Sequence, residues 1–368
     1  MGQRKGAVEV MVMDLSFYKD KTVLVTGHTG FKGTWLCKIL ELAGAKVTGF
    51  ALPSPTEEGG KVFKLSGVEG GMRSYIGDIR NFDALYRAFY AAKPEIVLHL
   101  AAQPIVRESY KDPMGTYATN VMGTVHLLEC ARTIGGVKSL LNVTTDKVYE
   151  NKEQEDKAYV ETEPLDGYDP YSNSKSCSEL VTHSYKKSFF ANGKVAVSTA
   201  RAGNVIGGGD FAVDRIIPDS IRAAYAGEAI KVRNPYSTRP YQHVLEPLYA
   251  YLMIAQAQYN NEAKYAGYYN VGPDECDCVT TGDLVDLFCK HWGNGLKWEN
   301  LSVGGPHEAK FLKLDCTKLK TTFNWQPRWH IDEAIAKTVE WSKVYQQQGD
   351  IAKCMEKQIN EFFKAEGK

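Results

Sequence analysis

The sequence predicts an α/β fold, in which a Rossmann-type, doubly wound parallel sheet is followed by a smaller, mixed α/β C-terminal lobe. Short runs of β-branched and apolar residues alternate with amphipathic segments in the first half of the chain. A glycine-rich turn joins the first such run to the first amphipathic segment, and beyond residue 203 the alternation ends. We expect an N-terminal extension (1–16), a sheet domain (17–202) and a lobe (203–368) that can return a strand to the main sheet.

The first predicted strand, Thr22–Thr26, leads into a turn with the spacing Gly-x-x-Gly-x-x-Gly. The first glycine allows a sharp turn, the second leaves room for the main chain to approach a diphosphate, and the third lets the next helix pack closely. Amide groups at the start of that helix face the anion. The strand before and the helix after favour a dinucleotide site over an ordinary turn. Its predicted residues are Gly27, Gly30, Phe31, Lys32 and Gly33.

The second and third predicted strands, Lys46–Ala51 and Arg73–Gly77, leave the choice of cofactor open. An acidic residue at the end of the second strand is typical of NAD sites, and an arginine there is typical of NADP sites; this chain has neither. Asp78 and Ile79 follow the third strand. Asp78 can bind an adenine amino group, or it can cap the predicted helix Phe82–Tyr90.

The fourth predicted strand, Glu95–Leu100, ends in two alanines and a glutamine. The small side chains of Ala101 and Ala102 suit the close approach of a flat ligand, although packing explains them equally well. We assign Leu100, Ala101, Ala102 and Thr119 to the cofactor and Gln103 to the substrate. A helix is predicted from Pro113 to Arg132, and its nearly continuous apolar face suggests pairing with a second copy of the chain.

The fifth predicted strand, Ser139–Thr145, brings three polar residues to the carboxyl end of the sheet, where ligands bind in open α/β folds. Thr145 can hydrogen-bond a substrate hydroxyl that is oxidised. Asp146, if protonated, can donate to a leaving hydroxyl, and Lys147, if neutral, can remove a carbon-bound proton. An ordinary Asp-Lys pair at a strand end is the alternative. The polar segment 151–164 that follows suggests a lid or a surface loop.

Tyr171 and Lys175 lie four residues apart at the start of the next predicted helix, so both project from one face. A nearby ammonium and an oxidised nicotinamide both favour the phenolate, which makes Tyr171 a base for alcohol oxidation. An exposed Tyr and Lys without a role is the alternative. After the sixth strand, Val195–Ala200, the loop-like segments of the lobe carry Arg215 and Arg239, which can clamp a diphosphate or lie free on the surface.

Composition excludes several classes of function. Lys and Arg balance Asp and Glu at 44 each, so we expect neither a nucleic-acid nor an acidic-membrane partner. We find no membrane-length apolar run and no secretory signal, and we expect a cytoplasmic protein whose eight cysteines are reduced. Cys276 and Cys278 form the one close pair. Because Cys289 and His291 are too little to complete a zinc site, we predict no metal.

Several motifs together resemble one branch of the extended short-chain dehydrogenase/reductase family, the nucleotide-sugar 4,6-dehydratases that act on CDP-glucose. The resemblance runs from about Phe17 to Glu340 and includes a lysine after the strand-end aspartate, where related dehydratases carry glutamate. Departures from the pattern are Tyr241-Gln242 and Thr144-Thr145, and neither removes a functional group on which the assigned roles depend. The motifs are GHTGFKG, HLAAQPIVRESY, TYATNVMGTVHLLE, TTDKVYEN, DPYSNSK, RAGNVIGGGDFAVDRIIPD, RNPYSTRPYQHVLEPL and PHEAKFLKLD.

The resemblance implies an NAD-dependent lyase with an internal hydride transfer from sugar carbon 4 to carbon 6, which serves deoxysugar and O-antigen or other polysaccharide biosynthesis. It implies that Thr145, Asp146, Lys147, Tyr171 and Lys175 are catalytic. It assigns the substrate diphosphate to Asn204 and Arg239, with Arg215 a weaker match. A homodimer or a dimer of dimers is expected. Another nucleotide-sugar dehydratase or a 4-epimerase is the alternative, and a catalytically silent cofactor sensor is disfavoured by the presence of Tyr171 and Lys175.

Overall fold

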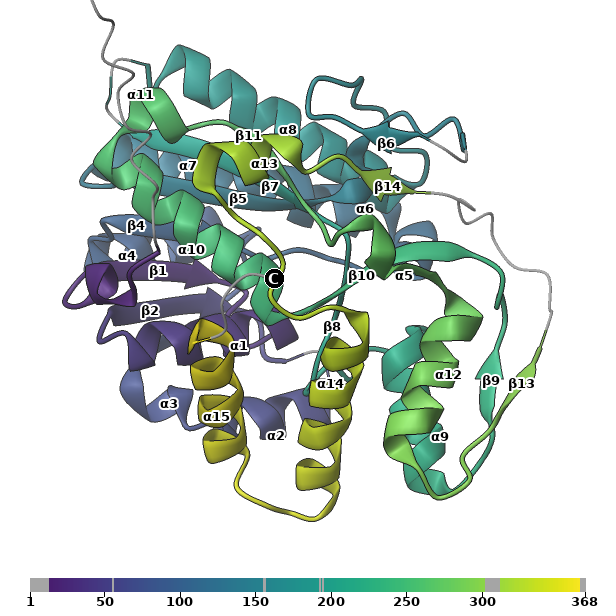
Figure 1. Cartoon of the computed structure of the whole chain (residues 1–368). Helices are drawn as coiled ribbons and strands as arrows, with labels where there is room; N and C mark the ends of the chain where they lie inside the picture. The colour runs from purple at the N-terminus through teal and green to yellow at the C-terminus, as the bar shows by residue number, and fades with distance from the viewer. Residues whose placement is uncertain are drawn as a thin grey trace, which may run out of the picture.

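Seven parallel strands form the central sheet (Figure 1). The computed structural model describes residues 13–54, 56–154, 157–191, 193, 195–301 and 312–364. The order across the sheet is β11-β7-β5-β4-β1-β2-β3, and every neighbouring pair is parallel. The strands are β1 (Thr22–Thr26), β2 (Lys46–Ala51), β3 (Arg73–Ile76), β4 (Ile96–His99), β5 (Ser139–Thr145), β7 (Ala196–Ala202) and β11 (Tyr268–Val271).

The chain winds outward from β1 in both directions, which confirms the predicted fold class. The order reverses between β1 and β4, the position at which open α/β sheets bind ligands. Helices on both faces connect the strands. They are α1 (Phe31–Leu42), α2 (Glu57–Leu65), α3 (Val68–Gly71), α4 (Phe82–Ala92), α5 (Val106–Lys111), α6 (Pro113–Tyr117), α7 (Gly123–Ile134) and α8 (Pro170–Ser188), with short 3-10 turns at Leu15–Tyr18 and Asp146–Val148.

Two apolar layers enclose the sheet because successive strand side chains point to opposite faces. Val23 and Val25 of β1 belong to the core that contains α1 and α10, whereas Leu24 belongs to the core that contains α4 and α7. Both layers are buried, so the inner strands read as continuous apolar runs. This burial is why the bounds of β1, β2 and β5 could be predicted from sequence.

The C-terminal half forms a lobe and also adds elements to the main sheet. The lobe has its own apolar core, built around α9, α12 and α14, and it lies to the right in Figure 1. From the same half, β11 joins the edge of the main sheet beside β7. Helix α10 is nearly fully buried and packs against the main sheet. Residues beyond 203 thus contribute both to the lobe and to the main sheet, and the domain boundary at residue 203 stays a prediction. The elements are β8 (Asn204–Ile206), α9 (Ile216–Ala226), β9 (Ile230–Val232), β10 (Thr238–His243), α10 (Leu245–Asn260), α11 (Glu262–Tyr265), a 3-10 turn (Glu275–Asp277), β12 (Cys278–Thr280), α12 (Thr281–Trp292), β13 (Trp298–Asn300), β14 (Lys313–Leu314), α13 (Thr317–Phe323), α14 (Ile331–Gln346) and α15 (Ile351–Lys364).

Two predicted segments differ from expectation. The helix expected from Pro113 to Arg132 contains a π-turn at Ala118–Met122, where buried Asn120 bonds to neighbouring chain segments. The polar segment 151–164 contains a two-residue strand, β6 (Ala158–Tyr159), paired with β14. Most of the predicted N-terminal extension (1–12) and residues 306–311 of the PHEAKFLKLD motif lie outside the described residues.

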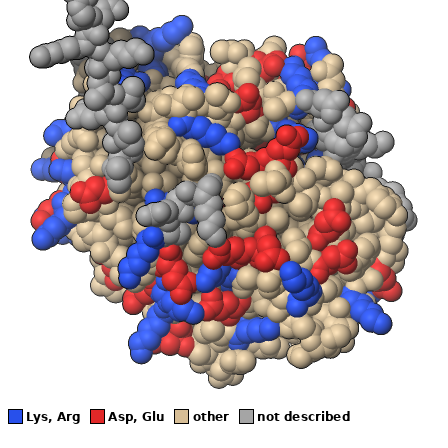
Figure 2. All heavy atoms as spheres, viewed as in Figure 1, with Lys and Arg blue, Asp and Glu red and all other residues tan. Residues whose placement is uncertain are grey.

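Charged side chains of both signs and free cysteines are distributed along the chain. Figure 2 shows Lys and Arg side chains interspersed with Asp and Glu over the face in view. All eight cysteines are free thiols. Within the described ranges, we find no helix that combines the length and apolarity needed to cross a membrane.

The glycine turn is fixed by close contacts. Gly27 has a φ of +78°, and a Cβ on it would lie 2.9 Å from the amide nitrogen of Ala101 at the end of β4. A Cβ on Gly33 would lie only 2.1 Å from the carbonyl oxygen of Gly27. Both glycines are therefore required by contact with backbone, which cannot move aside as a flexible side chain can.

We predict that Gly33→Ala lowers the free energy of unfolding by about 2 kcal/mol or more, because the added methyl group meets backbone in a closely packed turn. Gly60→Ala is the matched control in helix α2, since its Cβ would have only one neighbour, a Ser54 carbon at 3.8 Å. The control should be neutral or slightly stabilising. Urea unfolding of both variants measures the difference, and equal midpoints would contradict the steric argument.

Candidate active site

A cavity of about 650 Å³ lies at the carboxyl end of the sheet, between the sheet and the C-terminal lobe. Thr145, Asp146, Lys147 and Tyr171 line it from the sheet side. Asn204, Arg215 and Arg239 line it from the lobe, and Phe31 and Lys32 line it from the start of α1. The structure thus brings nine of the residues selected from sequence to one place.

The start of α1 fits the diphosphate of a dinucleotide. Gly30 is the N-cap of α1, and no side chain caps this helix. Its first amide groups can therefore serve a bound anion, and the helix dipole adds to that attraction. Lys32, in the first turn, brings an ammonium group whose pKa burial lowers to about 8, helped by nearby Arg215. An anionic ligand would favour its charged form.

Of the residues predicted to hold the rest of the cofactor, Leu100 and Ala101 lie close to the glycine turn. The amides of Leu100 and Ala101 each lie 3.2 Å from the Thr26 hydroxyl, and Gly27 packs directly against them. Ala102 follows in sequence, and Thr119 lies in the π-turn. Their assignment to the cofactor stays a proposal that rests on this proximity.

Of the two roles considered for Asp78, helix capping is wrong. Asp78 does not cap the helix at Phe82: the Asn81 side chain accepts from the Ala84 amide instead, and Asp78 pairs with Arg80 at 2.6 Å. The guanidinium of Arg80 holds the pKa of Asp78 below its usual value. Adenine binding by this carboxylate would compete with that ion pair. Ile79 is buried and packs against Gly123.

Gln103 does not line the cavity. Its side-chain nitrogen donates to the carbonyl of Ile105 at 3.1 Å and to the Thr116 hydroxyl at 2.9 Å, and its oxygen accepts from the Ile105 amide at 2.6 Å. The amide group is therefore committed to local structure. These hydrogen bonds of Gln103 could not be predicted from sequence, because the bonded residues belong to a turn and to a separate helix.

Thr145, Asp146 and Lys147 form a compact corner where β5 ends. The Thr145 hydroxyl donates to the Asp146 carboxylate at 2.9 Å, and the Lys147 amide lies 3.4 Å from the same hydroxyl. Burial raises the pKa of Asp146, although Lys147, Thr145, Arg239 and Lys32 each act in the opposite direction. The direction is the one that a proton-donating carboxyl requires.

Tyr171 and Lys175 lie on one face of α8, as predicted, but their electrostatics differ from expectation. Burial raises the pKa of Tyr171 to about 12, while a hydrogen bond with Thr145 acts to lower it. The Lys175 ammonium donates to the carbonyl of Val143 at 3.0 Å, and burial lowers its pKa to about 8. The protein charges therefore do not by themselves make Tyr171 a phenolate near neutral pH.

Of the two arginines expected in loops of the lobe, Arg239 lies on a strand, whereas Arg215 lies just before a helix. Arg239 lies in β10 and is buried, beside Asp146. Arg215 is the N-cap residue of α9, and its guanidinium pairs with Asp210 at 3.0 Å. A strand position fixes Arg239 more firmly than a loop would, which suits the binding of a diphosphate.

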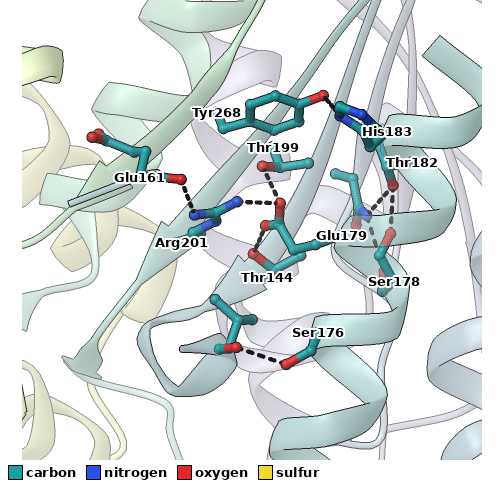
Figure 3. Close-up of polar contacts among 12 residues, drawn as sticks. Thr144, Glu161, Ser176, Ser178, Glu179, Thr182, His183, Thr199, Arg201 and Tyr268 are labelled. Atoms are coloured by element: carbon teal, nitrogen blue, oxygen red, sulfur yellow. Dashed lines mark hydrogen bonds and ion pairs between the residues drawn. The ribbon is translucent and has the colours of Figure 1, made fainter. Parts of the chain in front are cut away.

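Sequence analysis missed two groups of charged residues at this site. Asp214 pairs with Arg233 at 2.8 Å and with Arg107 at 3.4 Å, and all three line the cavity. Below the cavity, Glu179 and Arg201 form a buried ion pair at 2.9 Å (Figure 3). The spacing of Glu179 could have indicated the second group, since Glu179 follows Tyr171 and Lys175 at the same four-residue interval.

The cysteine group considered for zinc does not assemble. The Cys278 thiol donates to the carbonyl of Asp274, and His291 pairs with Asp332. Cys276 instead lies 3.8 Å from His330, whose Nδ1 is 2.8 Å from Asp277. Asp277 also accepts from the Ile331 amide at the start of α14, and the ligand atoms of Cys276, Asp277 and His330 lie within 4.8 Å of one another.

Comparison with known proteins gives the family. The sequence profile described as GDP-mannose 4,6 dehydratase matches residues 24–338. A CDP-glucose 4,6-dehydratase of Salmonella typhimurium is 45% identical over 359 residues, which cover 96% of this chain and 99% of the relative. The human GDP-mannose 4,6 dehydratase is 26% identical, with 86% of this chain and 90% of that protein covered.

Solved structures agree on the fold. A UDP-glucose 4-epimerase of Thermotoga maritima superposes with a TM-score of 0.76 at 23% identity, covering 88% of this chain and 99% of that one. A dTDP-glucose 4,6-dehydratase of Bacillus anthracis, crystallised with NAD, has a TM-score of 0.74 at 22% identity, with 89% and 98% covered. At these identities the likeness concerns the fold alone.

We predict that the difference in stability between the wild type and Lys175→Met grows with pH above 8. The pKa of Lys175 is about 8 in the folded chain and near its ordinary value of 10.5 when unfolded. Between these values the unfolded chain holds the additional proton, so raising the pH favours the folded state. The wild type should gain about 1.5 kcal/mol relative to the variant between pH 8 and 9.5.

Urea unfolding of both proteins at several pH values measures this difference, because groups remote from residue 175 titrate alike in the two chains. Curves that stay parallel across this range would show that the ammonium keeps an ordinary pKa in the folded protein.

Proposed function

Because the chain belongs to the GDP-mannose 4,6-dehydratase family, we propose that it converts CDP-D-glucose into CDP-4-dehydro-6-deoxy-D-glucose. The observation that carries the proposal is the placement of Asp146 and Lys147 beside Tyr171 in one cavity. Loss of water needs an acid and a base in addition to the groups that serve oxidation. The 45% identity to the Salmonella typhimurium enzyme supports CDP-glucose as the substrate.

Tyr171 and Thr145 would serve the oxidation of the hydroxyl at sugar carbon 4. Thr145 orients that hydroxyl, and Tyr171 takes its proton, with Lys175 below it on the same helix face. NAD, when bound, supplies the hydride acceptor and donor, and the positive charge of its oxidised ring would lower the pKa of the phenol. Gly27, Gly30, Phe31, Lys32 and Gly33 would hold its diphosphate.

Asp146 and Lys147 would carry out the elimination across carbons 5 and 6. A ketone at carbon 4 makes the proton on carbon 5 acidic, and Lys147 removes it. Asp146 donates a proton to the departing hydroxyl of carbon 6, a role that its raised pKa supports. Asn204 and Arg239 bind the substrate diphosphate, with Arg215 at the edge of the same cavity.

We predict that the wild type, with NAD, forms a keto-sugar from CDP-glucose in preference to UDP-glucose, dTDP-glucose and GDP-mannose. Asp146→Asn and Lys147→Ala should each lower the rate at least about 100-fold, because each removes a proton-transfer group. Lys152→Ala is the control, since Lys152 lies in the same segment, exposed and paired with Glu150. Chromatography of the nucleotide sugars measures the products.

Deuterium at carbon 4 of the substrate should appear at carbon 6 of the product. Label lost to solvent would contradict the internal transfer. A wild type that inverts carbon 4 without losing water would point to an epimerase, and full activity of Lys147→Ala would point the same way.

We also propose a homodimer that pairs through the α6–α8 side of the chain. The apolar residues of α7 that suggested a second subunit, such as Leu127 and Leu128, pack within this chain against the sheet. The exposed apolar side chains are instead Met114 of α6, Met122 of the π-turn and Leu180 of α8. These exposed apolar side chains belong to α6, the π-turn and α8, and they support association of two chains through that side.

We predict that light scattering gives a mass of two or four chains of 41.0 kDa, and that Leu180→Glu gives single chains. A buried carboxylate without a partner would oppose association. Leu65→Glu is the matched control, because Leu65 of α2 is 50% exposed and Leu180 is 55% exposed. Dissociation by both substitutions, or by neither, would contradict this interface.

A cytoplasmic location stays a prediction. It is supported by the eight free thiols, which oxidising compartments seldom leave unpaired. A role in deoxysugar and polysaccharide biosynthesis follows from the proposed product and is likewise a prediction.

A further inference from the structure

The carboxyl end of β5 projects beyond its neighbour on one side. The ladder between β4 and β5 ends at the pair His99 and Asn142. The ladder between β5 and β7 continues to Thr145, opposite Ala202. Residues 143–145 are therefore held by backbone pairing on the β7 side alone, although Thr145 must face the reacting hydroxyl.

Helix α8 supplies the missing support through side chains on one face. Tyr171, Lys175 and Glu179 recur every four residues along it. The Lys175 ammonium donates to the Val143 carbonyl at 3.0 Å, and the Thr144 hydroxyl donates to Glu179 Oε1 at 2.5 Å. Tyr171 and Thr145 line the cavity together, and Thr145 acts on the pKa of the Tyr171 phenol. Three consecutive residues of the projecting strand end thus each contact one residue of α8.

The Glu179 carboxylate is itself fixed from three sides (Figure 3). Besides Thr144, it accepts from the Thr199 hydroxyl of β7 at 2.8 Å and from Arg201 at 2.9 Å. Its side chain is 1% exposed and that of Arg201 is 3% exposed. Arg201 in turn donates to the Tyr149 hydroxyl at 2.9 Å. The carboxylate is therefore a rigid anchor and cannot follow a strand end that moves.

We propose that Glu179 is a positioning residue for the dehydratase reaction, which acts through Thr144 to hold Thr145 against Tyr171. Glu179 does not line the cavity, and its carboxylate is occupied by Thr144, Thr199 and Arg201. A displacement of about 1 Å between reacting groups can lower a rate by about 100-fold. Stability alone does not require this pair, because apolar residues of similar volume often replace a buried ion pair without loss. The inference rests on the proposed function.

Two isosteric substitutions separate positioning from stability. Thr144→Val and Thr199→Val each remove one hydroxyl donor from the same carboxylate, so both should lower the urea midpoint by similar amounts. Thr144 lies on the strand that carries Thr145, whereas Thr199 lies on β7. We expect Thr144→Val to lower kcat about tenfold with KM within about threefold, and Thr199→Val to keep kcat within about twofold.

Two further variants control for a direct effect of Thr144 on the cavity that it lines. Thr144→Ser keeps the hydroxyl and should restore kcat. Glu179→Met combined with Arg201→Met leaves Thr144 intact and avoids an unpaired buried charge, and it should lower kcat as Thr144→Val does. In the Thr144→Val protein the acidic limb of the kcat profile should move to higher pH, because a displaced Thr145 no longer lowers the pKa of Tyr171.

The outcomes distinguish this inference from the proposed function. Equal kcat values for Thr144→Val and Thr199→Val, or wild-type kcat in the double methionine variant, would overturn the positioning role. A wild type without activity on CDP-glucose would overturn the proposed function instead. Crystal structures of the two valine variants test the positioning role without any substrate: the Thr145 hydroxyl should be displaced relative to the Tyr171 phenol only in Thr144→Val, and an unchanged position there would refute the inference.

Discussion

Burial of charge at the carboxyl end of β5 is the constraint on which this structure depends. Asp146, Tyr171, Lys175 and Lys32 are four titratable groups in or below one cavity, and burial is the largest influence on the pKa of each. It raises the pKa of the acids and lowers the pKa of the lysines. Every group is thus moved toward its neutral form, which suits Asp146 as a proton donor, whereas the phenolate of Tyr171 needs the positive charge of a bound ligand.

The lobe balances this burial with positive charge from a strand and from the start of a helix. Arg239 on β10 acts on Asp146 across the cavity, and Arg215 acts on Lys32 and Tyr171. An anionic diphosphate between the sheet and the lobe would pair with these cations. Substrate binding and the proton equilibria of the catalytic groups are therefore coupled through a few charges in a region of low dielectric constant.

Sequence predicts what depends on burial pattern and on local geometry. The bounds of β1, β2 and β5 follow from runs that are buried on both faces, and the spacing of Tyr171 and Lys175 follows from the helical period. Choices between competing local contacts could not be predicted. Asp78 and Asn81 are both good capping residues, and only the fold shows that Arg80 occupies the first. The orientation of Gln103 depends in the same way on Thr116, which approaches from another element.

The role of the ion pair between Glu179 and Arg201 could not be predicted from sequence, because it depends on the strand register. On sequence, a glutamate two helical turns after Tyr171 is a solvated residue by default. In the folded chain β5 continues past β4 by three residues, and its end has to be fixed without a second ladder. A carboxylate is suited to this task, since it accepts from several directed donors at once, whereas an apolar contact would allow the strand end to slide. The cost of burying two charges is then explained by the precision that Thr145 needs.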